Sequence, residues 1–358
     1  MLNLDEVIGA ASDLKASDLF LRANARPAFR VHGRIRTTDY PVLTGEEVRE
    51  LAYSKMSGRQ IEQFERHHEM DVAFVVEGIC RVRCNVMMQR NTVSSVIRLI
   101  PFGIQTLEEL GLPPILTEFT KHRNGLVLVT GPTGCGKSTT LAGMLDYINS
   151  NRLVHIVTVE EPVEFVHPDK MAILNQREVG MDTDSFQEAL KHVMRQAPDV
   201  ILIGEMRDIE TMNVALQAAE TGHLVFATVH TASAAETLDR ISNMFAPHER
   251  PMLWLRLSTS LRGVVCQKLI PRADGKGRVA GLEIMVVTPT ISKMLEDGKS
   301  EDVYSQIRQA GTETYWGMQT MNQCLVKFVR AGVITEEEAL MNAGNFAELR
   351  QLLHRRDQ

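Results

Sequence analysis

The sequence predicts an α/β protein whose central domain is built on a parallel sheet. Continuous apolar runs alternate with helical stretches along the middle of the chain. Strands that are apolar on both faces are typical of a parallel sheet covered by helices on both sides. The runs are GLVLVTG (125–131), VHIVTVE (154–160), VILIGE (200–205) and LVFATVH (224–230), and the helical stretches cover 137–150, 184–196, 208–221 and 233–243.

Residues 1–100 predict a smaller α+β domain. The stretch 18–36 contains two β-like runs around the turn-prone segment Asn24–Pro27. A helix follows, because Thr44 and Glu47 have the spacing of a capping box. Residues 71–100 are rich in β-branched side chains and are interrupted twice by turn-forming residues, which predicts a meander of three strands.

The rest of the chain divides into a linker, the α/β domain and a helical tail. The stretch after residue 100 carries three prolines and two glycines, so we expect a linker over 101–120. The α/β domain then covers 121–287. The tail, 288–358, is expected to be helical, since Thr335–Glu338 and Asn345–Glu348 both have N-cap spacing.

The composition narrows the classes of function. The chain has 358 residues, 44% of them apolar, and a net charge of −6 that is unlike a protein that coats DNA. Its five cysteines form no CxxC pair, which favours a reduced, cytosolic chain over a disulfide or zinc framework. We see no signal peptide and no apolar run long enough to span a bilayer, so we expect a soluble protein, which can still dock on a membrane machine.

The segment GPTGCGKS, residues 131–138, matches the P-loop pattern G-x-x-x-x-G-K-[ST] in full. It lies between an apolar strand and a helix, where backbone N–H groups and the helix N-terminus can hold phosphate oxygens. Lys137 is expected on the β- and γ-phosphates and Ser138 on Mg²⁺, so ATP and Mg²⁺ are the predicted cofactors. The predicted nucleotide-binding residues are Gly131, Pro132, Thr133, Gly134, Cys135, Gly136, Lys137, Ser138 and Thr139.

Carboxylates follow two of the predicted strands. Glu205 ends a strand that we expect beside the P-loop strand, where a carboxylate can orient the attacking water and help to hold Mg²⁺. Glu160, Glu161 and Glu164 cluster after another strand, and three acids near an apolar strand are costly unless they face a cation or solvent. A Mg²⁺–nucleotide is the obvious cation, so Glu160 and Glu164 are further candidate catalytic carboxylates. The alternative for both groups is a solvated surface turn.

His230 follows a strand of the same sheet, and ligands bind outside the carboxyl ends of parallel strands. We therefore expect it to sense the γ-phosphate, and the alternative is a core histidine with a structural role. His223 begins the same strand, about 20 Å away along an extended chain. It is expected at a subunit boundary or in a structural role. Cys135 is either a thiol activated by the helix N-terminus or, as we favour, a small residue that fits the loop.

Arginines complete the active sites of many ring ATPases from a neighbouring subunit or domain. Arg83 and Arg98, on the predicted meander, are the first candidates for such an arginine finger. The other arginines that we considered are Arg81, Arg195 and Arg207.

Together these motifs resemble the secretion ATPases, specifically the type IV pilus retraction (twitching motility) ATPases of the PilT/PilU family. GPTGCGKSTTLA resembles their Walker A box, and TVEEPVEFVH resembles their Asp box with Glu161 in place of the usual aspartate. NQREVGMDTDSFQEALKHVMRQAPDVILIGEMRDIET is similar to the stretch that runs into their atypical Walker B. AAETGHLVFATVHTASAAETLDRI is similar to their His box, and GMQTMNQCL to their C-terminal segment.

This resemblance implies a PAS-like N-terminal domain, a RecA-like motor domain and a homohexameric ring. It also implies an inner-membrane pilus platform protein as partner, with a paralogous retraction ATPase as a further one and no nucleic acid. The expected function is an ATPase motor that retracts a type IV pilus, peripherally docked at the inner-membrane pilus base.

Several departures from the family pattern keep alternatives open. The Ala-Ile-Arg-Asn-Leu-Ile segment of PilT is replaced here by TISKMLEDGK (290–299). Together with other local differences, this departure favours PilU or a divergent PilT paralogue. An accessory retraction ATPase that depends on a primary motor is therefore one alternative. The others are an assembly or secretion ATPase, a nucleic-acid translocase with the same core, and a nucleotide-dependent scaffold without turnover.

Overall fold

The computed structural model describes residues 2–31, 33–101, 103–311 and 316–354, and its chain divides into two compact units. The smaller unit comprises Met1–Gly103 and Glu164–Val166, and the larger comprises Ile104–Val163 and His167–Gln358. Within the described residues, no helix combines the length and the apolar character that a membrane span requires.

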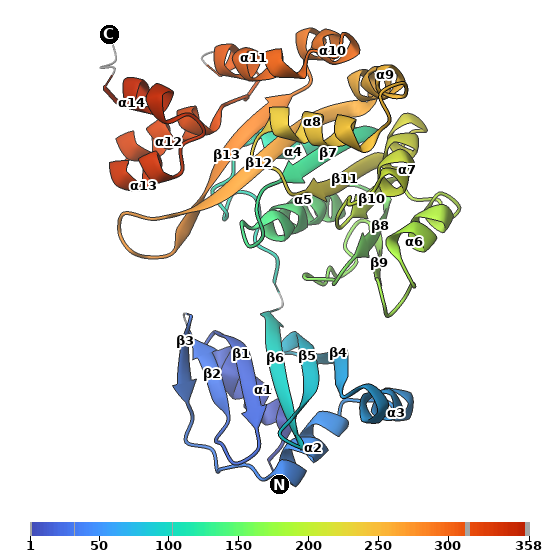
Figure 1. Ribbon diagram of the computed structural model, residues 1–358, viewed down its shortest axis with the longest axis vertical. Coiled ribbons are helices and arrows are strands. Elements are labelled where there is room, and N and C mark those ends of the chain that lie inside the picture. The colour runs from blue at the N-terminus through green and yellow to red at the C-terminus, as the bar shows by residue number, and fades with distance from the viewer. Residues whose placement is uncertain (1, 32, 102, 312–315, 355–358) are drawn as a thin grey trace. The chain divides into compact units, whose positions relative to one another are not determined.

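The smaller unit is an antiparallel sheet with three helices (Figure 1). Its strands lie in the order β3-β2-β1-β6-β5-β4, and the predicted meander is its β4-β5-β6 half. The capping box that begins α2 is present, with Thr44 and Glu47 each accepting a backbone N–H of the other. The elements are α1 (Leu4–Asp13), β1 (Ala16–Arg22), β2 (Ala28–Val31), β3 (Arg34–Thr37), α2 (Gly45–Tyr53), α3 (Gly58–His67), β4 (Glu69–Val76), β5 (Cys80–Gln89) and β6 (Thr92–Pro101).

The larger unit is built around a sheet in the order β13-β12-β7-β11-β10-β8-β9. All neighbouring strands are parallel except β12 and β13, which form an antiparallel edge. The predicted α/β class with a parallel central sheet is therefore confirmed. The strands are β7 (Gly125–Thr130), β8 (His155–Glu160), β9 (Ile173–Glu178), β10 (Val200–Ile203), β11 (Leu224–Val229), β12 (Leu261–Pro271) and β13 (Arg278–Val286).

Helices cover both faces of this sheet, which explains why its strands are apolar throughout (Figure 1). On β7, Leu126 and Leu128 join the core beneath one helical layer, and Val127 and Val129 join the core beneath the other. The first layer contains α6 (Phe186–Val193), α7 (Ile209–Glu220), α8 (Ala234–Met244) and α9 (Arg250–Ser260), and the second contains α4 (Ile115–Thr120) and α5 (Lys137–Asn151).

The segment expected as a linker over 101–120 belongs largely to the larger unit, which begins at Ile104. Leu107 and Leu112 are buried in the same core as α4, where Leu116 and Phe119 pack against β7 and α5. The prolines and glycines of this stretch set turns, while its leucines supply apolar area that the sheet covers.

The helical tail packs in two ways. Helices α10 (Pro289–Glu296) and α11 (Val303–Ala310) extend the core beneath α8 and α9. Three further helices surround a separate small core with Ile270 of β12. These are α12 (Met321–Arg330), α13 (Glu336–Met341) and α14 (Phe346–His354). The tail is therefore partly an extension of the α/β domain.

Candidate active site

The P-loop curls between β7 and α5. Gly131, Gly134 and Gly136 have φ angles of 141°, 76° and 88°, a region of backbone conformation that favours glycine. Gly136 is also the N-cap of α5, and no side chain caps the helix there. Consecutive amides at a helix N-terminus form an anion-binding concavity, so this loop has the geometry of a phosphate site.

Lys137 is buried at the start of α5, with 9% of the residue exposed. Its ammonium donates hydrogen bonds to the carbonyl oxygens of Gly131 at 2.7 Å and Pro132 at 3.2 Å. Among the described residues, no carboxylate lies within ion-pair distance of this ammonium. Carbonyls solvate the charge without neutralising it, so the loop holds a net positive charge suited to a phosphate.

The oxygen donors near this loop fit Mg²⁺. Ser138 and Thr139 lie half-buried in the first turn of α5. The hydrogen bond from Arg207 is the main cause that lowers the pKa of the Glu205 carboxyl, and the charge of Lys137 adds to it. Hydroxyl and carboxylate oxygens are the protein ligands that Mg²⁺ prefers, alongside phosphate oxygens. Within the described chain, no three His, Cys, Asp or Glu side chains are grouped to hold a metal.

Glu205 follows β10 and is held by Arg207. The Arg207 guanidinium donates to Glu205 Oε2 at 2.8 Å and to Glu161 Oε2 at 3.2 Å. The hydrogen bond from Arg207 holds the pKa of Glu205 below its usual value, although burial opposes the shift. Glu205 is therefore ionised at neutral pH, as a group that orients or deprotonates water must be.

The expectation that the strand of Glu205 lies directly beside the P-loop strand is wrong. Strand β11 lies between β7 and β10. The order of strands in a sheet depends on how the helical crossovers pack, which short motifs do not encode. His230 consequently ends the strand adjacent to the P-loop strand, and Glu205 ends the next one.

His230 and Glu205 meet across these two strand ends. His230 Nε2 lies 3.4 Å from Glu205 Oε1, and 33% of the histidine side chain is exposed. The backbone around them is fixed, since the Thr228 hydroxyl donates to the Gly204 carbonyl and Met206 N donates to Thr228 O at 3.0 Å. Arg240 also donates to His230 O at 2.9 Å. A partly exposed imidazole is thus held beside the carboxylate.

Comparison with known proteins identifies the family of this chain. Residues 2–341 match the family model described as type II/IV secretion system protein. The chain belongs to this family. It is 45% identical to the type IV pilus retraction ATPase PilT of Pseudomonas aeruginosa PAO1, over 94% of this chain and 97% of that protein. It is 41% identical to the type IV pilus ATPase PilU of the same strain, over 94% of this chain and 87% of that protein.

A solved structure supports the same assignment. A crystal structure of the pilus retraction motor PilT with bound ADP superposes with a TM-score of 0.92 at 43% identity, covering 98% of this chain and all of the other. The predicted family and the RecA-like fold are therefore confirmed. The protein is an ATPase of the PilT/PilU group of secretion ATPases.

Within this secretion ATPase, the three acids at the end of β8 and just after it have separate surroundings. Glu160 Oε1 accepts hydrogen bonds from Thr158 Oγ1 at 2.7 Å and from Gln176 Nε2 of β9 at 3.3 Å. Glu161 pairs with Arg207. Glu164 is exposed and belongs to the short run Glu164–Val166, which is part of the smaller unit. Roles for Glu160 and Glu164 in hydrolysis remain predictions.

The two first-choice arginines face each other in the smaller unit. Arg83 on β5 and Arg98 on β6 are directly opposite in register, and both are exposed. Arg98 Nε lies 3.2 Å from Asp18 Oδ1, and Arg30 pairs with the same buried carboxylate. Within the described residues Arg83 makes no ion pair. Arg83 is thus the less constrained of the two.

The remaining candidates have local partners or exposed positions. His223 Nδ1 lies 3.0 Å from Ala218 O in the turn between α7 and β11, at the opposite end of the strand from His230. Arg207 is held by carboxylates of its own chain, as described above, and Arg195 is exposed after α6. Burial raises the pKa of the Cys135 thiol, which opposes an activated thiolate.

Gln267 is not among the residues predicted from the sequence, although it contacts the P-loop. It lies on β12, is 3% exposed, and donates to Cys135 O at 2.7 Å. The available signal was a polar residue inside the apolar run LRGVVCQKLIP. A buried amide needs partners, but sequence alone does not say which.

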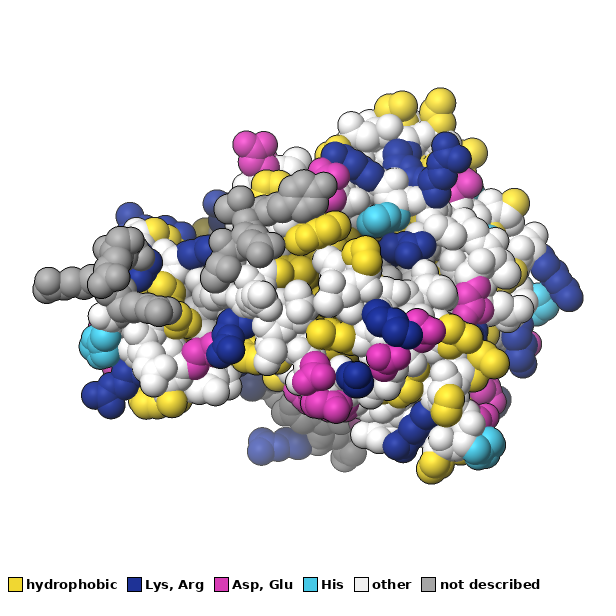
Figure 2. All heavy atoms as spheres, turned by 90° about the horizontal axis from the view of Figure 1, so that it is seen from above, with side chains coloured by type: hydrophobic (Ala, Val, Ile, Leu, Met, Phe, Trp, Pro, Cys, Tyr) yellow, Lys and Arg dark blue, Asp and Glu magenta, His cyan; other side chains and the backbone are white. Residues whose placement is uncertain are grey.

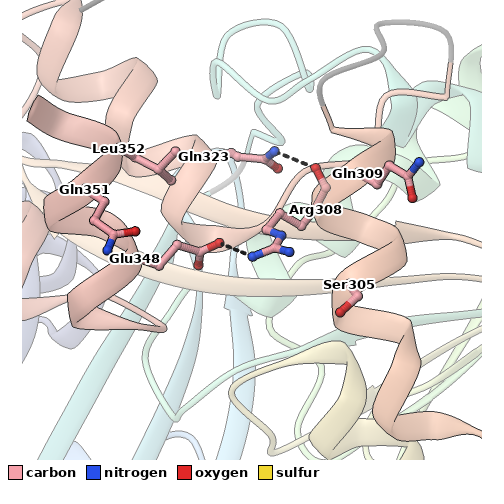
Figure 3. A pocket seen from close by; sticks show the side chains of 7 residues that line it. All are labelled: Ser305, Arg308, Gln309, Gln323, Glu348, Gln351 and Leu352. Carbon is pink, nitrogen blue, oxygen red and sulfur yellow. Dashed lines mark hydrogen bonds and ion pairs between the residues drawn. The ribbon is translucent and has the colours of Figure 1, made fainter. Parts of the chain in front are cut away.

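A polar pocket of about 790 Å³ lies among α11, α12 and α14 (Figure 3). Arg308 and Glu348 form an ion pair of 3.5 Å across it, and Gln323 donates to Arg308 O at 2.9 Å. Asn322 also donates to Glu348 Oε2 at 2.8 Å. These polar groups satisfy one another, and none of the lining residues belongs to the P-loop or to the sheet edge with Glu205.

Proposed function

We propose that this secretion ATPase hydrolyses ATP at the P-loop and uses the energy to retract a type IV pilus. The observation that carries the proposal is the Glu205–His230 pair at the sheet edge that the P-loop also occupies. The retraction ATPases named above, which match over most of their length, support the choice of pilus retraction as the work performed.

Each residue has a role that follows from its chemistry. Lys137 and the loop amides bind the phosphates, and Ser138 with Glu205 would help to hold Mg²⁺. When bound, Mg²⁺ neutralises charge on the β- and γ-phosphate oxygens. Glu205 orients and deprotonates the attacking water, with Glu160 and Glu164 as further carboxylates. His230 donates a hydrogen bond to a γ-phosphate oxygen, which ADP lacks.

The proposed assembly is a homohexamer in the cytoplasm, docked at the inner-membrane base of the pilus. In such a ring an arginine of one subunit completes the site of the next, with Arg83 or Arg98 as the finger. Hydrolysis would drive an inner-membrane platform protein. A paralogous retraction ATPase is a further partner.

The accessory role is the second candidate function. TISKMLEDGK, the departure that motivates it, corresponds to helix α10 and its C-terminal turn (Pro289–Glu296). A nucleic-acid translocase has less support, because basic side chains are interspersed with acidic and apolar ones on the face in Figure 2. Strand tracking requires a continuous positive groove with stacking aromatics.

The decisive experiment joins biochemistry to pilus retraction. Lys137→Ala removes the buried cation from the loop, and we expect it to abolish ATP hydrolysis by the purified, folded protein. In the source organism, a deletion complemented by wild type should restore retraction, whereas Lys137→Ala should not. Retraction that persists in the deletion strain, and disappears only when a paralogue is also deleted, would assign the accessory role. Full turnover by Lys137→Ala would contradict the site itself.

A further inference from the structure

Gln267 joins the P-loop to the helix that follows it. Its Nε2 donates to Cys135 O at 2.7 Å, and its Oε1 accepts from Thr140 Oγ1 at 2.7 Å. Gln267 and Thr140 are 3% and 1% exposed. One buried amide on β12 therefore spans from the middle of the loop to the first turn of α5, with both of its ends hydrogen-bonded.

Two of the loop glycines make room for this strand. A Cβ on Gly131 would lie 2.3 Å from the Gln267 carbonyl oxygen, and one on Gly136 would lie 2.8 Å from Gln267 Nε2. A Cβ on Gly134 would meet nothing within 4 Å. A side chain at Gly131 would therefore collide with the backbone of β12, one at Gly136 would displace the Gln267 amide, and both positions also have φ angles that favour glycine.

The hydrogen bond to Cys135 also sets the direction of a loop amide. In a trans peptide the carbonyl and the following N–H point in opposite directions. Since the Cys135 carbonyl points at Gln267, the N–H of Gly136 points away from β12. Gly136 is the N-cap of α5, where amides of the loop and helix gather for an anion.

We propose that Gln267 is a positioning residue that holds the P-loop in the conformation that binds nucleotide phosphates. The inference rests on the proposed nucleotide site and adds a residue outside its motif. Without the amide, the 135–136 peptide can rotate, and binding must then supply the cost of ordering it. ATP and ADP share the phosphates that the loop holds, so both lose affinity alike.

The test measures binding of fluorescent ADP and ATP analogues to the full chain. Gln267→Met keeps the side-chain volume but removes both hydrogen bonds, and Thr140→Val removes one of them. We expect Thr140→Val to weaken both nucleotides by about fivefold, the effect of one lost hydrogen bond, and Gln267→Met to weaken them by about tenfold or more, since it loses two. Thr140→Ser should restore wild-type affinity. KM for ATP should rise by the same factor while kcat changes by less than about twofold. This is the pattern expected when an interaction that is equally strong in the ground state and the transition state is lost.

Gln319 offers a matched control in the same unit. It is 6% exposed, donates to Leu282 O at 3.0 Å and accepts from Lys327 at 3.0 Å. Gln319→Met should lower the melting temperature and leave nucleotide affinity unchanged. If Gln267→Met and Thr140→Val lower only the melting temperature, the inference is wrong. If Gln267→Met does not fold, the nucleotide affinities of Thr140→Val and Thr140→Ser test the inference instead. Wild-type protein that binds neither nucleotide would overturn the nucleotide site and this inference with it.

Discussion

His230 Nε2 lies 3.4 Å from Glu205 Oε1, so the ends of neighbouring strands β11 and β10 place an imidazole against a carboxylate. Neither side chain is fully exposed, with 33% and 23% of their areas accessible. The contact joins the residue proposed to recognise the γ-phosphate to the residue proposed to activate water. In this proposal, recognition of ATP and its hydrolysis share one structural element.

His230→Ala should change the preference between nucleotides. The imidazole can donate to a γ-phosphate oxygen, so we expect ATP to weaken relative to ADP by about 1–3 kcal/mol, the range for a hydrogen bond to a charged group. Isothermal titration with both nucleotides measures the difference. His223→Ala, at the other end of β11, is the control and should leave the ratio unchanged. Equal losses for ATP and ADP with a lowered melting temperature would make His230 a structural residue.

Glu205→Gln should bind ATP and turn it over very slowly. Glutamine keeps the shape of the side chain but cannot accept a proton from water, and loss of a general base typically costs 10²–10⁴-fold, roughly the decrease that we expect in kcat. Single-turnover assays separate this defect from weaker binding. Turnover within about threefold of wild type would move the proposed role to Glu160 or Glu164.

Arg207→Gln should make hydrolysis more sensitive to acid. The hydrogen bond from Arg207 lowers the pKa of Glu205, while burial raises it. Removing the guanidinium takes away the largest contribution that lowers the pKa of Glu205, while burial still raises it. Glu205 is then protonated at higher pH. We expect the acidic limb of the kcat profile to move toward neutral pH.

The lowered pKa of Glu205 also predicts how the stability of the fold depends on pH. A depressed carboxyl pKa stabilises the fold above the unfolded-state pKa, and this contribution is lost as pH falls through the folded-state pKa. Arg207→Gln should therefore narrow the difference in melting temperature between neutral and acidic buffer. Lys191→Gln removes an exposed charge on α6 and serves as the control. An acidic limb that is identical in Arg207→Gln and Lys191→Gln would show that Arg207 does not tune Glu205.

A shared active site can be tested by mixing subunits. If Arg83 acts in the neighbour's site, Arg83→Ala and Glu205→Gln rings are each inactive, but mixed rings contain sites with both groups intact. Random assembly at equal amounts should restore about a quarter of the sites in a closed ring. ATPase assays after mixing, with ring size checked by light scattering, give the answer. No recovery in mixed hexamers would place the arginine in the same subunit or outside the site.

Arg98→Ala provides the comparison for Arg83. Arg98 pairs with the buried Asp18, which also has Arg30 as a partner. We expect a loss of about 1 kcal/mol in the stability of the smaller unit, typical of a partly exposed ion pair. ATPase activity that vanishes while hexamers and melting temperature are unchanged would instead identify Arg98 as the finger.

Local patterns in the sequence determined much of the fold and part of the site. The P-loop, the strands β7, β8, β10 and β11, and the capping box of α2 depend on short-range chemistry, namely glycine conformations, apolar runs and cap hydrogen bonds. Edge strand β9 was not predicted, because its residues ILNQRE contain no apolar run, and of the six only the last is buried. The placement of Glu205 and His230 at the carboxyl edge of the sheet followed from a general rule of parallel sheets.

The tertiary structure determined the features of the site that depend on contacts between segments far apart in the sequence. The insertion of β11 between β7 and β10 brought His230, rather than Glu205, next to the P-loop strand. Arg207 joined Glu205 to Glu161, 46 residues away from the arginine, and Gln267 reached Cys135 across 132 residues. Such pairs depend on strand order and side-chain packing, which the whole core sets at once, so a motif alone does not reveal them.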